Sequence, residues 1–392
     1  MRVATVGIVA LAGTRHAAEQ SVDSGMASAA SETTDFLVDR SDLRRCTTKH
    51  GPSPDDVALA PGQLLLGIDA FALTANNVTY AVFGDAMAYW QFFPSEGEWG
   101  RVPVWGFADV VRSRHDAVPD GERVYGYFPM STHLVVQADR VTDASFVDAS
   151  PHRQPLPPVY NQYTRVAHDP SYERPHENLQ MLFRPLFTTA FLLDDLLADR
   201  DFFSAGTVLL GSASSKTALA LALLLSRNRR SRCRVVGLTS PAHARFAERV
   251  GVYDRVVPYG EIGSLPADAP AVLVDMAGSG QVLAAVHEHF RERLKSSCLV
   301  GATHWEAPRP SEALPGPKPE FFFAPDRVRQ RTRDWGAEGF QARVGASWRE
   351  FVPAAESWVT VVRRSGAAAV EEAYRDVLDG RATPDRGYVL SL

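Results

Sequence analysis

The sequence predicts an α/β protein built from a partly open β-barrel and a doubly wound parallel sheet. About residues 35–150 read as short strands separated by Gly- and Pro-containing turns, which is typical of a barrel. From about residue 179 onward strands alternate with helices, as in a parallel sheet with right-handed crossovers. The length of 392 residues suits two domains that each bury a core of their own.

The predicted barrel strands are apolar segments bounded by turns. Gly and Pro mark these turns, as in Pro61-Gly62, and no helical periodicity separates the segments. Strands that are joined by turns rather than by helices favour a barrel over βαβ units. The clearest segments are residues 63–73, 103–111, 123–128 and 133–137.

The predicted parallel sheet follows a polar connection, residues 150–178, which is rich in Pro, Tyr and His. A long ordered loop in a compact domain is often functional. Residues 320–392 are expected to hold helices and a terminal strand at 388–390. Between them, we expect strands at residues 207–210, 234–238, 255–257, 271–275 and 297–301, and helices at residues 179–199, 214–226, 241–250 and 281–294.

The composition excludes several classes of protein. A net charge of −5 with interspersed signs lacks the basic excess of a nucleic-acid binder. No apolar run reaches the roughly 18 residues of a membrane span. Cys46, Cys233 and Cys298 are far apart and form no C-x-x-C motif, which disfavours a zinc site or a disulfide framework. We therefore expect a cytoplasmic protein that acts on a small molecule, without metal, nucleic acid or membrane.

Residues 1–32 are expected to form a disordered extension outside the fold. Residues 14–34 are small and polar, which is typical of disordered segments. Met26 opens a more natural beginning than Met1, so the sequence leaves open whether residues 1–25 are translated.

A nucleotide-binding turn is predicted where the strand at residues 207–210 leads through small residues into a helix. Small residues allow a pyrophosphate to approach backbone N–H groups at a helix N-terminus. Gly211 is the glycine of this turn, and Ala or Ser occupies the other small positions. The candidate cofactor-binding residues are Gly211, Ser212, Ala213, Ser214, Ser215, Lys216 and Thr217.

Two other interpretations of the turn were weighed. The tail Ser215-Lys216-Thr217 is similar to a Walker A loop, but Gly211 lies one residue too close to Lys216 and Ser215 replaces the second glycine. A degenerate domain that binds no nucleotide remains the alternative, because two fingerprint glycines are missing.

The residues after the second strand predict NADPH rather than NADH. NAD sites place an acid there to hold the ribose 2′-hydroxyl, whereas this chain has Thr239, Ser240 and Arg245. Arg245 could equally be a solvated helix residue. Turns after later strands are placed to contact nicotinamide and ribose, or are ordinary turns; their candidates are Ala277, Gly278, Gly301, Ala302 and Thr303.

Several segments resemble the medium-chain dehydrogenase/reductase superfamily, in its zinc-free quinone-oxidoreductase and enoyl-reductase branches. More closely, residues 33–392 resemble a family of bacterial proteins known as a domain of unknown function (2855). The segments that carry the resemblance include ALTANNVTYAVFGDAMAYWQFFP (72–94), RPLFTTAFLL (184–193) and VLLGSASSKTALALA (208–222); the others are residues 102–111, 121–136 and 235–246.

The resemblance implies a GroES-like catalytic barrel drawn from both chain ends, residues 33–180 and 325–392. It implies a Rossmann nucleotide-binding domain at residues 181–324, a site in the cleft between the two, Thr188 near the nicotinamide, and a possible homodimer. Zinc-dependent members carry a Gly-His-Glu segment, whereas the matching residues 104–107 here contain no ligand. We therefore expect zinc-free reduction.

The zinc-free branches reduce quinones or C=C bonds beside a carbonyl, with a proton donor or hydrogen bond that stabilises the enolate. Tyr80 is the candidate donor, assisted by Asn76 or Asn77, although Asn76 could be a turn cap and Tyr80 a core residue. The substrate candidates are Trp90, Phe92, Tyr127, Phe128, Tyr160 and His304, although such aromatic residues often fill a core.

Two other functions stay open from the sequence. The same fold supports a non-redox lyase or isomerase, with Tyr80 and His304 as acid and base. A nucleotide-binding protein without catalysis would also keep the phosphate turn.

Overall fold

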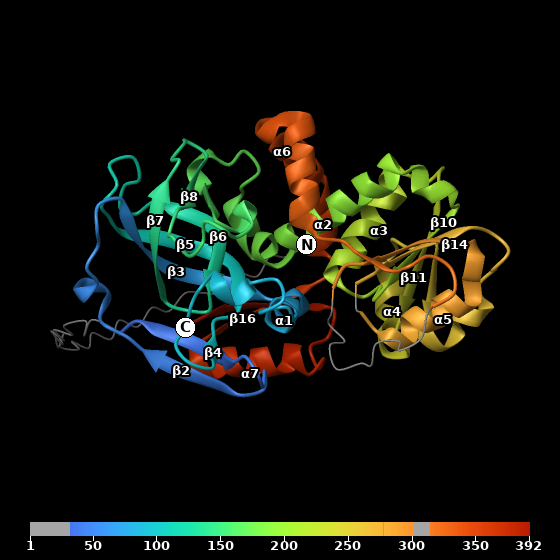
Figure 1. Ribbon diagram of the computed structural model, residues 1–392, viewed down its shortest axis with the longest axis horizontal. Helices are drawn as coiled ribbons and strands as arrows, with labels where there is room; N and C mark the ends of the chain where they lie inside the picture. The colour runs from blue at the N-terminus through green and yellow to red at the C-terminus, as the bar shows by residue number, and fades with distance from the viewer. Residues whose placement is uncertain (1–31, 277, 302–313) are drawn as a thin grey trace, which may run out of the picture.

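The computed structural model describes residues 32–276, 278–301 and 314–392. Figure 1 shows a β-rich part and a parallel-sheet part at opposite ends of the molecule, with helices α2 (Glu177–Asp199) and α6 (Ala324–Glu356) between them. The predicted combination of a partly closed barrel and a parallel sheet is confirmed. Nearly all of the expected N-terminal extension lies outside the described residues.

The barrel is a sheet in the order β16-β17-β3-β5-β6-β9-β8-β7, closed by an additional pairing between β3 and β7. Strand β3 pairs with β17 and β5 and also with β7, which closes the sheet. It can do so because it is long and has two register shifts, near Leu65 and Ile68, where a bulge lets the strand bend. The strands are β3 (Gln63–Leu73), β5 (Pro103–Ser113), β6 (Arg123–Pro129), β7 (His133–Asp139), β8 (Ser145–Asp148), β9 (Gln162–Arg165), β16 (Thr360–Ser365) and β17 (Arg386–Ser391).

Both chain ends contribute to the barrel. The C-terminal strand β17 pairs antiparallel with β3 and parallel with β16. A small separate sheet, β2-β1-β4, lies beside it. Its strands are β1 (Thr34–Asp39), β2 (Cys46–His50) and β4 (Trp99–Gly100), and helices α1 (Ala75–Val82) and α7 (Ala367–Leu378) complete this part.

The second sheet is parallel throughout, in the order β12-β11-β10-β13-β14-β15. The chain moves outward from β10 to β12 and then returns to the other side of β10 with β13, so the carboxyl ends of β10 and β13 flank a topological switch point, where such sheets bind ligands. Its strands are β10 (Thr207–Gly211), β11 (Arg234–Thr239), β12 (Arg255–Pro258), β13 (Ala271–Asp275), β14 (Leu294–Leu299) and β15 (Glu320–Phe321).

Helices cover both faces of this sheet. Val208 and Leu210 of β10 pack with α2 and α3 (Lys216–Asn228), whereas Leu209 packs on the opposite face with α5 (Gly280–Phe290). Helix α4 (Pro241–Val250) lies on the α3 side. Strand β14 begins three residues earlier than the sequence predicted, because α5 already ends at Phe290.

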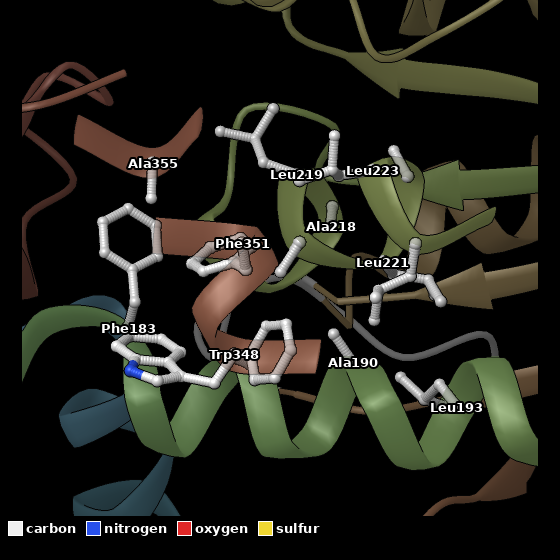
Figure 2. Close-up of a cluster of buried hydrophobic side chains, with 14 of the residues drawn as sticks. Phe183, Ala190, Leu193, Ala218, Leu219, Leu221, Leu223, Trp348, Phe351 and Ala355 are labelled. Atoms are coloured by element: carbon white, nitrogen blue, oxygen red, sulfur yellow. The ribbon is translucent and has the colours of Figure 1, made fainter. Parts of the chain in front are cut away.

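Helices α2, α3 and α6 share one core (Figure 2). The rings of Phe187 and Trp348 lie 5.4 Å apart and those of Phe187 and Phe351 lie 4.7 Å apart. Ala218 and Leu221 of α3 join the same cluster. Helix α2 therefore holds the nucleotide-binding sheet and α6 together through apolar burial.

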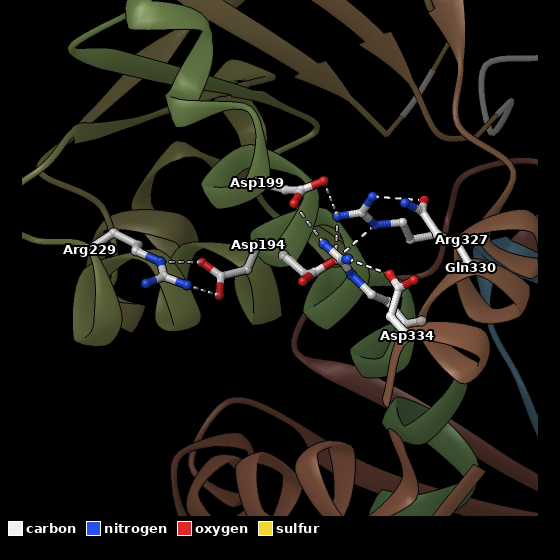
Figure 3. Close-up of polar contacts among 8 residues, drawn as sticks. Asp194, Asp199, Arg229, Arg327, Gln330 and Asp334 are labelled. Atoms are coloured by element: carbon white, nitrogen blue, oxygen red, sulfur yellow. Dashed lines mark hydrogen bonds and ion pairs between the residues drawn. The ribbon is translucent and has the colours of Figure 1, made fainter. Parts of the chain in front are cut away.

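Charged contacts also tie α6 to α2 (Figure 3). Asp195 accepts hydrogen bonds from Arg327 and Arg331, each at 2.8 Å, and Asp199 pairs with both arginines. Because Arg327 and Arg331 are buried, these pairs fix the position of α6. Among the described residues, none of the helices combines the length and apolarity needed to cross a membrane.

Candidate active site

A cavity of about 830 Å³ lies between the barrel and the carboxyl edge of the parallel sheet. Its walls come from α1, α2, α6, the β10–α3 turn, the end of β11 and the start of β17. The predicted site residues that line it are Asn76, Tyr80, Tyr160, Thr188, Ser212, Ser214, Ser215, Lys216, Thr217, Thr239, Ser240 and Gly301.

Some small residues of the phosphate turn allow close packing of the strands, and others line the cavity. Gly211 is buried, and a Cβ there would stand 2.3 Å from Asp275 Oδ1, so this glycine lets β10 and β13 approach closely. Ala213 is also buried, against Gly237. Neither lines the cavity, whereas Ser212, with a φ of 54°, and the residues after Ala213 do.

The start of α3 is capped by the chain itself. The Ser215 side chain accepts a hydrogen bond from the backbone N–H of Ala218 at 3.3 Å. The helix N-terminus faces the cavity through Ser215, Lys216 and Thr217, which gives that wall a partial positive charge.

Lys216 reaches from this turn to the barrel. Its Nζ donates to the carbonyl oxygen of Arg386 at 3.0 Å and lies 5.9 Å from the centre of the Phe183 ring. Burial lowers the pKa of Lys216 to about 8, and the charge of Asp385 offsets part of that effect. Among the described residues, no carboxylate lies within salt-bridge distance of the Lys216 ammonium, and Lys216 lines the cavity.

The first turn of α4, which follows β11, brings His243 to the cavity, although His243 was not predicted from the sequence. His243 Nδ1 and Ser214 Oγ lie 3.1 Å apart, so the start of α4 contacts the β10–α3 turn at this point. Burial lowers the pKa of His243. Arg245, which the sequence favoured, is exposed two residues further along α4 and does not line the cavity.

Tyr80 lies on the barrel side of the cavity, on α1. Its hydroxyl oxygen accepts a hydrogen bond from Trp105 Nε1 at 3.3 Å. Burial raises the pKa of Tyr80, with hydrogen bonds from Trp105 and Asn76 opposing the rise. The phenol is therefore neutral at ordinary pH and holds a proton that it can donate.

Asn77 is held by the fold rather than turned toward the cavity. Its Oδ1 accepts from the backbone N–H of Thr74 at 2.7 Å, and its Nδ2 donates to the carbonyl oxygen of Pro103, also at 2.7 Å. These contacts cap α1 and fasten it to β5. Asn76, in contrast, lines the cavity beside Tyr80.

A cluster of aromatic side chains surrounds the Tyr80 ring. Tyr89 lies 4.7 Å from it between ring centres, and the hydroxyls of Tyr89 and Tyr160 are 3.4 Å apart. Tyr89, Trp105 and Tyr160 line the cavity together with Tyr80.

The other predicted substrate aromatics lie behind this layer. Phe92 and Tyr127 are buried in the same cluster, and Tyr127 OH has no hydrogen-bond partner among the described residues. Phe128 packs against Tyr163 in the barrel core, and Trp90 packs against Gly84 and Gly100. None of the four lines the cavity.

The remaining predicted residues fall into two groups. Thr188 lines the cavity, and its hydroxyl donates to the carbonyl oxygen of Arg184 at 2.9 Å. Gly278 does not line the cavity; its backbone N–H donates to Asp275 Oδ2 at 2.9 Å. No group of three potential metal ligands occurs within residues 32–276, 278–301 and 314–392. Ala277, Ala302, Thr303 and His304 lie outside the described residues.

The chain matches one family model, described as a protein of unknown function (DUF2855), over residues 71–383. No curated protein matches it in sequence. Among solved structures, CurA of Vibrio vulnificus in complex with NADPH is similar at 14% identity, with a TM-score of 0.57 over 91% of this chain and 98% of that one.

Two further structures have the same fold. A mutant enoyl thioester reductase from Candida tropicalis shares 10% identity, with a TM-score of 0.55 over 92% of this chain and 100% of its own. The yhdH oxidoreductase of Salmonella enterica in complex with NADP shares 10%, with a TM-score of 0.51 over 92% and 99%. The expected fold, a GroES-like barrel joined to a Rossmann sheet, is confirmed.

Proposed function

The chain belongs to the DUF2855 family, and we propose that it is an NADPH-dependent reductase of an activated C=C bond or a quinone. One observation carries the proposal: the phosphate turn and the Tyr80 hydroxyl open into the same cavity. A hydride donor held at one wall would therefore share the cavity with a proton donor at the other. Similar structures that hold NADPH or NADP support the choice of cofactor.

The residues that face the cavity fit a dinucleotide phosphate. Ser212, Ser214 and Ser215 are small enough for the backbone at the start of α3 to approach a pyrophosphate. No acidic side chain from the end of β11 lines the cavity, so a 2′-phosphate would meet Thr239, Ser240 and His243 without repulsion. Thr188 and Gly301 line the path from there to Tyr80, where the nicotinamide would be held.

NADPH would supply the hydride when bound. Tyr80 would donate a hydrogen bond or a proton to the carbonyl side of the substrate as negative charge develops there. Trp105 would orient the phenol through its indole N–H, and Asn76 would offer a second polar contact. The surrounding rings of Tyr89 and Tyr160 would exclude water from the reacting atoms.

The test is the loss of nicotinamide absorbance when the protein and NADPH meet enones, enoyl thioesters and quinones. We expect oxidation of NADPH with at least one of these classes, above the rate without protein. If NADPH binds and none of the classes is reduced, the protein is not the reductase proposed here and a non-catalytic nucleotide-binding role takes its place.

Replacing His243 with alanine is expected to weaken NADPH binding about tenfold or more and to leave NADH binding unchanged. The reason is that a hydrogen bond to a charged phosphate contributes roughly 1.5–3 kcal/mol, and NADH lacks the 2′-phosphate. Nicotinamide fluorescence titrations of both cofactors measure the effect. Arg245→Ala is the control, because Arg245 is exposed and away from the cavity. If NADPH affinity falls in Arg245→Ala and not in His243→Ala, Arg245 is the residue that contacts the 2′-phosphate, as the sequence had predicted.

NADPH affinity is expected to weaken as the pH rises above about 8, the pKa to which burial brings Lys216. A bound phosphate raises the pKa of this ammonium further, so binding takes up a proton between the two pKa values and the dissociation constant rises by up to about tenfold per pH unit there. Below pH 8 the Lys216 contribution is fully present. The Lys216→Met variant should bind more weakly and lose this pH dependence; the same slope in both proteins would assign it to another group.

A cytoplasmic homodimer remains a prediction. Strand β15 forms one edge of the parallel sheet, and the exposed Phe321 lies on it. Edge strands of this kind offer unpaired backbone groups to a second copy. The molecular mass in solution tests the dimer.

A further inference from the structure

Arg184 stands at the cavity wall on α2, one helical turn before Thr188. Its guanidinium lies over the Trp348 ring at 5.2 Å. Its hydrogen bond to a described residue is a long one, from Nη1 to Ser171 Oγ at 3.3 Å. A guanidinium has five N–H donors, so most of its capacity is left for the cavity.

Three buried or half-buried arginines of the β-barrel part have carboxylate partners. Arg153 pairs with Asp148 at 3.0 Å, Arg165 with Glu122, and Arg123 with three carboxylates that include Glu177 at 2.7 Å. Within the described residues, Arg184 has no carboxylate at salt-bridge distance. Asp169, which also lines the cavity, acts on Arg184 through its charge and through Ser171, whose hydroxyl donates to Asp169 Oδ1 at 2.7 Å.

The electrostatics of Arg184 favour an incoming anion. Burial lowers the pKa of Arg184, the nearby Arg349 lowers it further, and Asp169 opposes both effects. A partly desolvated cation with no carboxylate at salt-bridge distance is unfavourable, and a ligand carboxylate would relieve that cost. Arg349, on α6, lines the same end of the cavity and adds a second positive charge.

An aromatic wall connects Arg184 with Tyr80. Tyr125, whose hydroxyl donates to the carbonyl oxygen of Gln180 on α2 at 3.4 Å, is stacked on Trp105 with 5.7 Å between ring centres. Trp105 in turn donates to Tyr80. Both Tyr125 and Trp105 line the cavity. A flat apolar body would fit along this wall, with polar groups at its two ends.

We propose that Arg184 binds a carboxylate of the substrate, and that the substrates are planar, unsaturated carbonyl compounds with a carboxylate at one end. The guanidinium fork matches a carboxylate in two parallel hydrogen bonds, and the carbonyl end would lie toward Tyr80. The word substrate rests on the reductase function proposed above, whereas binding of the anion does not.

The binding test uses the full-length protein without cofactor and follows tryptophan fluorescence, since Trp348 and Trp105 lie beside the site. Cinnamate and the neutral cinnamamide are the probes. We expect saturable binding of cinnamate, at least about tenfold tighter than that of cinnamamide, because a charge-assisted hydrogen bond is lost in the amide. Equal binding of the two probes, or competition by inorganic phosphate in place of carboxylates, would overturn the proposal.

The variants then locate the effect. Arg184→Gln should remove the preference for cinnamate over cinnamamide, whereas Arg329→Gln, on an exposed part of the same helix as Arg349, should keep it. A preference retained in Arg184→Gln contradicts the assignment. If Arg184→Gln does not fold, the comparison of the two probes on the unchanged protein still decides whether the cavity selects a carboxylate.

An activity measurement separates this inference from the reductase proposal. NADPH oxidation is compared for 4-oxo-4-phenylbut-2-enoate and for its methyl ester. We expect kcat/KM to be at least about tenfold higher for the acid, with the difference lost in Arg184→Gln. Equal reduction of acid and ester refutes the carboxylate site and leaves the reductase. Selective cinnamate binding with no NADPH oxidation leaves the anion site and refutes the reductase.

Discussion

Replacing Tyr80 with phenylalanine is expected to lower kcat about 100-fold or more while NADPH affinity stays unchanged. A positioned general acid contributes roughly 10²–10⁴-fold to a rate. Burial keeps the Tyr80 phenol protonated, and Trp105 fixes its oxygen. Because Phe keeps the ring contacts with Tyr89 and Tyr127, only the hydroxyl is lost. Steady-state kinetics with the best acceptor and a fluorescence titration with NADPH measure the two quantities.

The matched control is Tyr172→Phe, which removes a hydroxyl that donates to Glu177 outside the cavity. It should leave kcat within about twofold of the unchanged protein. Unchanged turnover in Tyr80→Phe would remove Tyr80 from its proposed role. Tyr89→Phe and Tyr160→Phe would then show whether one of the neighbouring hydroxyls is the donor.

Replacing Arg153 with methionine is expected to lower the free energy of unfolding by about 3–5 kcal/mol, the typical cost of removing one partner of a buried ion pair. Arg153 is fully buried and donates to Asp148 and Asn161, each at 3.0 Å, and to Tyr163 OH at 2.8 Å. Methionine would leave the buried Asp148 carboxylate without its cation. Urea denaturation measures the loss.

Arg140→Met is the control, since that side chain is mostly exposed and its Nε lies 4.0 Å from Asp139. An exposed pair of this kind contributes roughly 0–1 kcal/mol. Arg153 also holds the carbonyl oxygen of Tyr160, so its replacement should raise KM through the loosened cavity wall. A loss of stability no larger than that of Arg140→Met would contradict the structural role.

Periodicity predicted most of the fold. The strand at residues 63–73 and the phosphate turn were placed well because their apolar runs are long and bounded by clear turns. Strand β16 was missed, since Arg363 and Arg364 interrupt its apolar alternation at the edge of the sheet. Local sequence patterns also cannot show that β16 pairs with β17. In that pairing Thr360 lies opposite Arg386, which is 26 residues further along the chain.

The site was harder to predict, because lining a cavity is a tertiary property. Tyr127 and Phe128 are neighbours on β6 and point to different clusters, and neither lines the cavity, although both suited an aromatic pocket by composition. Asn77 serves as the structural cap that the sequence had allowed for Asn76. The choice between Arg245 and His243 depends on which side of α4 faces Ser214, which the sequence alone does not specify.

The most direct test of the central claim is a titration of the purified protein with NADPH, followed by nicotinamide fluorescence, with NADH in parallel. A cavity that joins the phosphate turn, His243 and Tyr80 predicts saturable NADPH binding with a dissociation constant below about 1 mM, tighter than that of NADH. No binding of NADPH at about millimolar concentration would contradict the account.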